Sequence, residues 1–166
     1  DGKVQYFTPQ GTQRGVVPAA QFYRLDSTLA GANVNTAQSM LGVGCTLSSS
    51  TQYEFEIIFN CSKSAGTTSH SFGVLFGGTA TLNNIGYEVV ANTSTVSFTG
   101  SFGTTFMVAP QVATTINLQS GLTSATQFHV IMLRGTVSIN NGGTFIPQYI
   151  CSVAPGGAYT TAQSSR

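Results

Sequence analysis

The sequence predicts an all-β protein: an antiparallel β-sandwich, jelly-roll-like, with an extended N-terminal arm. Short segments alternate apolar and polar residues, glycine and asparagine separate them, and no stretch of any length repeats with a helical period. The 166 residues favour one domain. We therefore expect an arm or linker over residues 1–20 and a sandwich of roughly eight to ten short strands over residues 21–166.

The first twenty residues differ from the rest in composition. The segment DGKVQYFTPQGTQRGVVPAA is loop-rich and contains Pro9, Gly11, Gly15 and Pro18. Proline and glycine interrupt regular strands, so this segment is predicted to be extended. It begins without methionine or a signal-like apolar stretch. We expect the chain to be a processed product, a fragment or the ordered part of a longer protein.

The first clear strands lie in the middle of the chain. Thr51 to Ser62 (TQYEFEIIFNCS) alternates, with Tyr53, Phe55, Ile57 and Phe59 on one face and Glu54, Glu56 and Asn60 on the other, together with Ile58. After the loop KSAGTT, Ser71 to Gly77 puts Phe72, Val74 and Phe76 on one side. These two segments are predicted to pair as a hairpin. Further strands are predicted at Ile85–Val89, Thr95–Gly100, Gly103–Ala109 and Ala113–Leu118.

A second hairpin is predicted near the C-terminus. Gln127 to Ile139 forms a long strand, Asn140 to Gly143 (NNGG) supplies the positive φ angles of a tight turn, and Thr144 to Ser152 returns. Pro147 lacks an N–H donor and indicates an edge or a bulge. Residues 129–133 are apolar on both faces except for His129, which predicts that this part of the strand is covered on both sides.

Charge is scarce and unevenly placed. Only 7% of the residues are charged, against about 25% in ordinary soluble domains. Six basic and five acidic residues leave no net field to attract a polyanion or an anionic membrane, so neither nucleic acid nor membrane insertion is expected. No charged residue occurs from Val89 to Leu133. Either serine and threonine hydroxyls solvate this run, or other subunits cover it.

Glu54 and Glu56 are the only closely spaced carboxylates. At positions i and i+2 of a strand they share a face about 6.5–7 Å apart, a separation that some glycosidases use. An exposed polar strand face is the favoured interpretation. The remaining acids are Asp1, Asp26 and Glu88.

Other reactive residues form no recognisable site. His70 and His129 have no ligand-like spacing to a cysteine or an acid, as a zinc site would require. There is no GxSxG motif for a Ser–His–Asp triad, and Gly42-Val43-Gly44 lacks the third glycine of a dinucleotide site. No catalytic residue, metal or cofactor is predicted, and the chain is not expected to be an enzyme.

The cysteines and the possible sugar contacts leave alternatives open. Reduced structural thiols are favoured for Cys45, Cys61 and Cys151, with one disulfide and a spare thiol as the alternative. Asn60 and Asn92 match the N-glycosylation sequon at about the frequency expected by chance. A sugar site built from amides, threonines and Tyr23 or Tyr159 is conceivable, but no binding residue is predicted.

Four long segments resemble structural proteins of tailed bacteriophages, closest to the fibre-like or knob-like proteins of phages that infect cyanobacteria and other aquatic bacteria. They cover most of residues 14–162: RGVVPAAQFYRL (Arg14–Leu25), LAGANVNTAQSMLGVG (Leu29–Gly44), SKSAGTTSHSFGVLFGGTATLNNIGY (Ser62–Tyr87) and RGTVSINNGGTFIPQYICSVAPGGAY (Arg134–Tyr159). The resemblance implies a virion component, a homotrimer with a β-sandwich head on an N-terminal arm or shaft. It also implies a shaft upstream of Asp1 and a closing strand beyond Arg166.

The expected function is that of a structural protein on the outer surface of a phage virion. A tail fibre or appendage would trimerise by itself, whereas a capsid decoration (cement) protein would use residues 1–20 to reach neighbouring capsid subunits. Its expected partners are further copies of itself and other virion proteins. Three alternatives remain: a receptor- or carbohydrate-binding module for host attachment, a glycan-cleaving enzyme using Glu54 and Glu56, and a secreted cellular lectin-like or complement-like sandwich.

Overall fold

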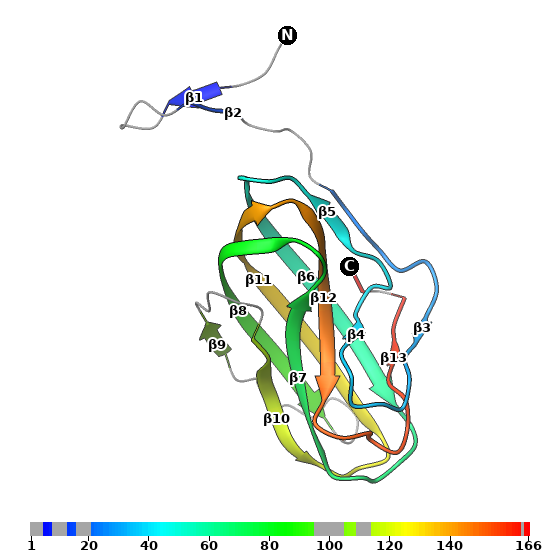
Figure 1. The fold of residues 1–166 in the computed structure, drawn as a ribbon. Helices are drawn as coiled ribbons and strands as arrows, with labels where there is room; N and C mark the ends of the chain where they lie inside the picture. The colour runs from blue at the N-terminus through cyan, green and yellow to red at the C-terminus, as the bar shows by residue number, and fades with distance from the viewer. Residues whose placement is uncertain (1–4, 8–12, 16–20, 95–104, 109–113, 164) are drawn as a thin grey trace.

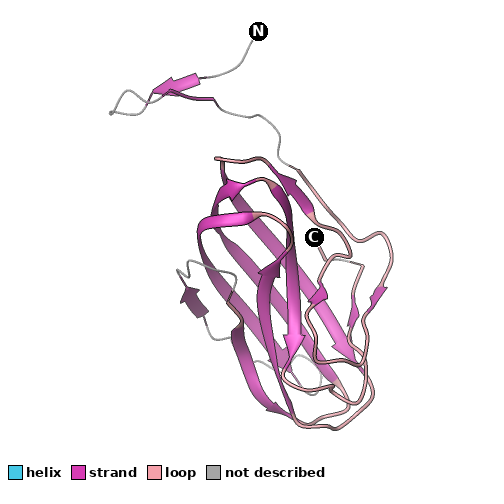
Figure 2. Cartoon of the chain, viewed as in Figure 1, coloured by secondary structure: helices cyan, strands magenta, loops and turns pink. Residues whose placement is uncertain are grey.

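The computed structural model is an all-β structure in which two antiparallel sheets pack against each other as a β-sandwich (Figures 1 and 2). It describes residues 5–7, 13–15, 21–94, 105–108, 114–163 and 165–166. Across these ranges there are thirteen strands and no helix, and hence no helix that could cross a membrane. The all-β sandwich prediction is confirmed.

The first sheet has five strands built around β7 and β12. β7 pairs with β10 on one side and β12 on the other, and β12 then pairs along different parts of its length with β4 and β5. The bounds are β4 (Gln38–Ser39), β5 (Cys45–Leu47), β7 (His70–Gly77), β10 (Ile116–Leu122) and β12 (Gly143–Cys151).

The second sheet has six strands, with the long strand β11 at its centre. The order is β3-β13-β6-β11-β8-β9, and β11 pairs with both β6 and β8 over nearly its whole length. The bounds are β3 (Leu29–Ala30), β6 (Gln52–Lys63), β8 (Thr81–Ser94), β9 (Thr105–Val108), β11 (Gln127–Asn141) and β13 (Thr160–Thr161).

Both predicted hairpins are wrong, although their strands exist. β6 and β7 lie in different sheets, and so do β11 and β12. The loops after β6 and β11 therefore carry the chain across the sandwich. No residue of the turn Asn140–Gly143 has the positive φ that a tight hairpin would need. Pro147 lies where the partner of β12 changes from β5 to β4, so its missing N–H interrupts neither ladder.

The jelly-roll type stays a prediction, which the strand order favours. Apart from the short strands β3, β4 and β13, the sheets read β10-β7-β12-β5 and β6-β11-β8-β9. Along the chain, β5, β6, β7 and β8 alternate between them, as do β10, β11 and β12. Such alternation is expected of interleaved Greek keys.

The N-terminal arm is also untested as a whole. Within residues 1–20 the structure describes two short strands, β1 (Gln5–Phe7) and β2 (Gln13–Gly15), which pair antiparallel. The predicted strand Thr95–Gly100 lies outside the described residues, whereas β9 falls within Gly103–Ala109.

The core lies between the sheets and has two chemically different ends. One end is an aromatic cluster, in which Phe76 lies 4.6 Å from Phe145 and 5.1 Å from both Phe55 and Tyr87, measured between ring centroids. At the other end, polar side chains are buried among the rings of Phe72, Tyr149 and Tyr159.

Candidate functional site

The outer face of the six-stranded sheet is divided by one row of charged residues. The ladder sets Arg134 on β11 directly opposite Glu56 on β6 and Glu88 on β8. Glu88 and Arg134 also border the charge-free run from Val89 to Leu133. The two ends of that run therefore lie side by side, with Val89 opposite Leu133.

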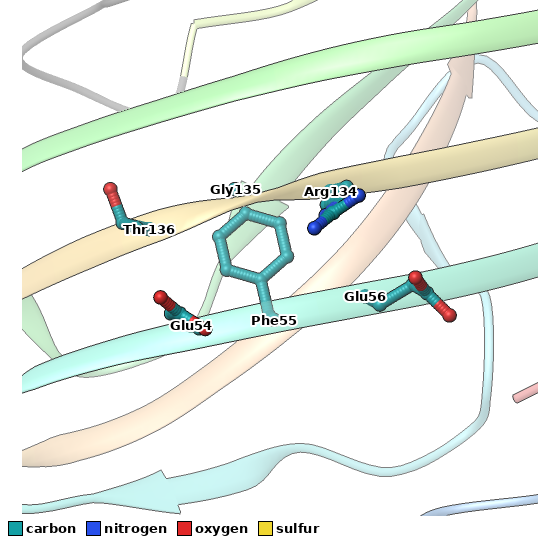
Figure 3. Close-up of a pocket in the computed structure, with 6 residues that line it drawn as sticks. All are labelled: Glu54, Phe55, Glu56, Arg134, Gly135 and Thr136. Carbon is teal, nitrogen blue, oxygen red and sulfur yellow. The ribbon is translucent and has the colours of Figure 1, made fainter.

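On one side of this row the outer face is charged; we call this side, together with the row, the charged half. Glu54 lies opposite Thr136, one step from the Glu56–Arg134 pair. These four side chains come from two strands at alternate positions, so they project from the same face. They surround an open hollow of about 360 Å³, whose floor is the Phe55–Gly135 pair (Figure 3).

The hollow keeps its polar groups accessible. Glu54, Glu56, Arg134 and Thr136 are all exposed. The only ion pair among the described residues is elsewhere, between exposed Arg24 and Asp26 at 2.9 Å. Three of the five acidic residues of the chain thus gather on this face, Glu54, Glu56 and Glu88. Arg134 projects from β11 between two of them, Glu56 on β6 and Glu88 on β8.

On the other side of the row, the described segments of β6, β8 and β11 carry no charged side chain on this face; we call these segments the uncharged half. Exposed Arg166 pairs with Ile58 along the β6 edge and borders this half. Met132 on β11 lies between Ile58 on β6 and Val90 on β8, and Val130 follows one step further along β11. Val90 is 37% exposed and the other three are half-buried. An apolar strip thus stays partly open to solvent on a sheet face that is normally polar.

Behind the uncharged half, the interior holds a polar cluster. Lys63 is only 3% exposed, and its ammonium donates hydrogen bonds to the carbonyls of Ala65 (3.2 Å), Gly66 (2.7 Å) and Ser124 (2.8 Å). Gln127, directly opposite Lys63 in the ladder, donates to the same Ser124 carbonyl at 2.7 Å. The ammonium therefore ties the β6–β7 loop to the β10–β11 loop.

Both histidines belong to this cluster. His70 donates from Nδ1 to the Thr68 carbonyl at 2.8 Å, and its Nε2 lies 2.8 Å from the Tyr159 hydroxyl. Tyr159 also donates to Gln127 Oε1. His129 stacks on Phe72 with ring centroids 4.3 Å apart, and no described group hydrogen-bonds its Nδ1.

Burial opposes charge on His129 and on the thiols of Cys61 and Cys151. Burial, reinforced by His70 and Lys63, lowers the pKa of His129 to about 3. Burial raises the pKa of the Cys61 thiol well above its usual value and that of Cys151 to about 11. Since the thiolate is the nucleophile, these buried thiols are unreactive near neutral pH.

The sequence-derived candidates are therefore separated in space. Glu54 and Glu56 share a face as predicted, but on an open surface that does not exclude water as catalytic sites do. His70 and His129 lie in the core, and all three cysteines are free thiols. Tyr159 is 1% exposed, so it cannot line a surface sugar site, whereas Tyr23 bonds to Gln21 at 3.0 Å.

Four residues of these sites were not singled out from the sequence: Arg134, Thr136, Lys63 and Gln127. Alternation along Gln127–Ile139 puts Arg134 and Thr136 on the face of Val130 and Met132. It does not reveal that β6 lies beside them. The sequence assigns Lys63 to the loop KSAGTT, although one more step of the alternation in Thr51–Ser62 puts it on the inner face. Its acceptors are backbone carbonyls, which the sequence does not reveal.

Known proteins add no further information. No family model, no curated protein and no solved structure matches the chain.

Proposed function

We propose that this chain is a structural protein of the outer surface of a phage virion, where it assembles as a homo-oligomer, a trimer in the simplest case. The phage origin and the three copies rest on the sequence resemblance. Assembly rests on one observation: the two ends of the charge-free run pair in register on β8 and β11, so that this part of the sheet face is uncharged and carries an apolar strip.

The apolar strip suits a subunit contact. Exposed apolar surface rimmed by polar residues is typical of interaction sites, and charged residues are depleted at interface centres. Ile58, Val90, Val130 and Met132 have this arrangement, with the Glu56–Arg134–Glu88 row at one border. Covering the strip would also shield β11 on both faces here, as the sequence predicts.

The interior supports a structural role over a catalytic one. His70, His129, Lys63, Cys61 and Cys151 are all buried between the sheets. The histidines and the lysine hold loops and strands together there. An enzyme would need such groups at an accessible site.

Light scattering coupled to size-exclusion chromatography tests the assembly. The expected mass is three times that of one chain and independent of dilution through the micromolar range. A monomer at every concentration would contradict the proposal. Electron cryo-microscopy of the particle that carries the protein then separates a tail appendage from a capsid decoration.

A second candidate role is attachment to a receptor or glycan on the host surface. The observation that favours it is the hollow between β6 and β11, which is bordered by Glu56 and Arg134 of the charged row and lies outside the apolar strip. Binding of host lipopolysaccharide at millimolar concentration is the expected result. Its complete absence would exclude this role and leave the assembly proposal standing.

A further inference from the structure

The hollow on the charged half has a built arrangement of hydrogen-bonding groups. Two adjacent cross-strand pairs form its corners, Glu54 with Thr136 and Glu56 with Arg134. Side chains two apart on a strand are about 6.5–7 Å from each other, and directly opposite ones have Cβ atoms about 4.5–5.5 Å apart. This rectangle is the size of one sugar ring.

The signs of the corner charges restrict what can occupy it. Glu54 and Glu56 repel a simple anion, and Arg134 offsets part of their attraction for a simple cation. A neutral ligand with many hydroxyl groups can use all three charged groups without repulsion from any of them. Its hydroxyls can donate to the carboxylates and accept from the guanidinium, while the Thr136 hydroxyl does either.

Gly135 lies between Arg134 and Thr136 on β11, and the side it leaves without a side chain faces the interior. It lies opposite Phe55, and a Cβ placed on it would collide with the backbone of Gly86 and Tyr87. The ring of Phe55 packs at this same place against the aromatic cluster, 5.1 Å from Phe76. The floor is therefore supported from inside by rigid packing, as a preformed site requires.

We propose that this hollow binds one ring of a neutral saccharide. Glu54 and Glu56 accept hydrogen bonds from neighbouring sugar hydroxyls, and Arg134 donates to a sugar oxygen. This inference names the ligand class and site of the attachment role and rests on that role. It does not depend on the oligomeric state.

Nuclear magnetic resonance of the intact protein tests it with defined probes. These are the neutral methyl glycosides of glucose, galactose, mannose and N-acetylglucosamine, the cation glucosamine and the anion glucuronate. At least one neutral glycoside is expected to shift the amides of residues 54–56 and 134–136 with millimolar affinity, and more strongly than either charged sugar. Silence from all neutral probes, or tighter binding of a charged sugar, would overturn the proposal.

A pair of matched variants separates the hollow from the general charge of the face. Glu56→Gln replaces one acceptor oxygen of the hollow with an amide donor, removes the negative charge, and is expected to weaken saccharide binding at least tenfold. Glu88→Gln removes the same charge beside Arg134 but outside the hollow, and is expected to change binding less than twofold. Equal effects of the two variants would reject the site.

Lipopolysaccharide as a further probe distinguishes failure of the site from failure of the attachment role. If it binds the wild type and the Glu56→Gln variant equally, attachment stands and the proposed hollow falls. If neither protein binds it and no glycoside binds, both fall. Loss of lipopolysaccharide binding in Glu56→Gln alone supports the site.

Discussion

The two halves of the six-stranded sheet are built in opposite ways. In the charged half, the outer face is polar and the core behind it is an aromatic cluster of Phe55, Phe76, Tyr87 and Phe145. In the uncharged half, the outer face carries an apolar strip. The core behind that strip holds Lys63, Gln127 and His129.

This inversion suggests a division of labour along one sheet. Aromatic burial stabilises the charged half from inside, so its outer face can remain polar and open to solvent. Behind the uncharged half lies a hydrogen-bonded network that fixes the conformation of the β6–β7 and β10–β11 loops. In the assembly that we propose, its outer apolar strip is the part of the face that contacts another subunit.

The largest expected stability change comes from breaking the buried network. Lys63→Met keeps the aliphatic stem but leaves the carbonyls of Ala65 and Gly66 without this donor, whereas the Ser124 carbonyl keeps its bond from Gln127. Each buried acceptor left unpaired costs about 1–3 kcal/mol, so the free energy of unfolding should fall by about 3–5 kcal/mol. Chemical denaturation measures it. Arg24→Met, at an exposed ion pair, is the control and should change stability by less than about 1 kcal/mol. Equal effects of the two variants would contradict the assigned role of the Lys63 hydrogen bonds.

A smaller loss is expected from overpacking the aromatic end. In Gly135→Val the new side chain collides with the backbone of β8 at Gly86 and Tyr87. Overfilling a packed core typically costs about 1–3 kcal/mol, so thermal unfolding should occur several degrees lower. Gly121→Ala has open space around its Cβ and pays only for a φ of 70°. If Gly135→Val is as stable as Gly121→Ala, β8 and β11 can adjust to the added side chain and the predicted collision does not occur.

Acid should weaken the uncharged half through His129. Its pKa is about 3 in the folded protein and about 6.5 when unfolded, so below pH 6.5 the unfolded chain binds more protons. The stability that depends on neutral His129 is fully present above pH 6.5. It is lost as the pH falls towards 3, at about 1.4 kcal/mol per pH unit. About 2 kcal/mol should be gone at pH 5.

Denaturation curves between pH 7 and pH 4 measure this loss. His129→Leu removes the titrating ring. Between pH 7 and pH 5 its free energy of unfolding should therefore fall by about 2 kcal/mol less than that of the wild type. If the wild type and His129→Leu show the same pH dependence, the buried neutral state of His129 is not what acid attacks.

Much of the local structure follows from alternation, whereas the pairing does not. The pattern in Thr51–Ser62 correctly puts Phe55, Ile57 and Phe59 inside and Glu54 and Glu56 outside. Alternation states which face a residue occupies and says nothing about the neighbouring strand. That is why both predicted hairpins are wrong, and why the approach of Arg134 to Glu56 could not be anticipated.

The wrong prediction for the Asn140–Gly143 turn and the missed burial of Lys63 have a related cause. Asn140–Gly143 has the composition of a tight hairpin turn, but packing of the two sheets directs β12 into the opposite layer, which composition cannot reveal. Lys63 had no acidic partner in the sequence. Its charge is satisfied by loop carbonyls that are brought together only by the fold.

The central claim is that the uncharged half is the surface by which copies of this chain associate. Val130 and Thr136 lie on the same outer face of β11, one in each half, and glutamate at either position faces outward. Light scattering of Val130→Glu and Thr136→Glu, with circular dichroism to confirm folding, compares the two halves directly. We expect Thr136→Glu to keep the mass of the trimer and Val130→Glu to be a folded monomer. A folded Val130→Glu trimer, or dissociation by Thr136→Glu alone, would contradict the claim.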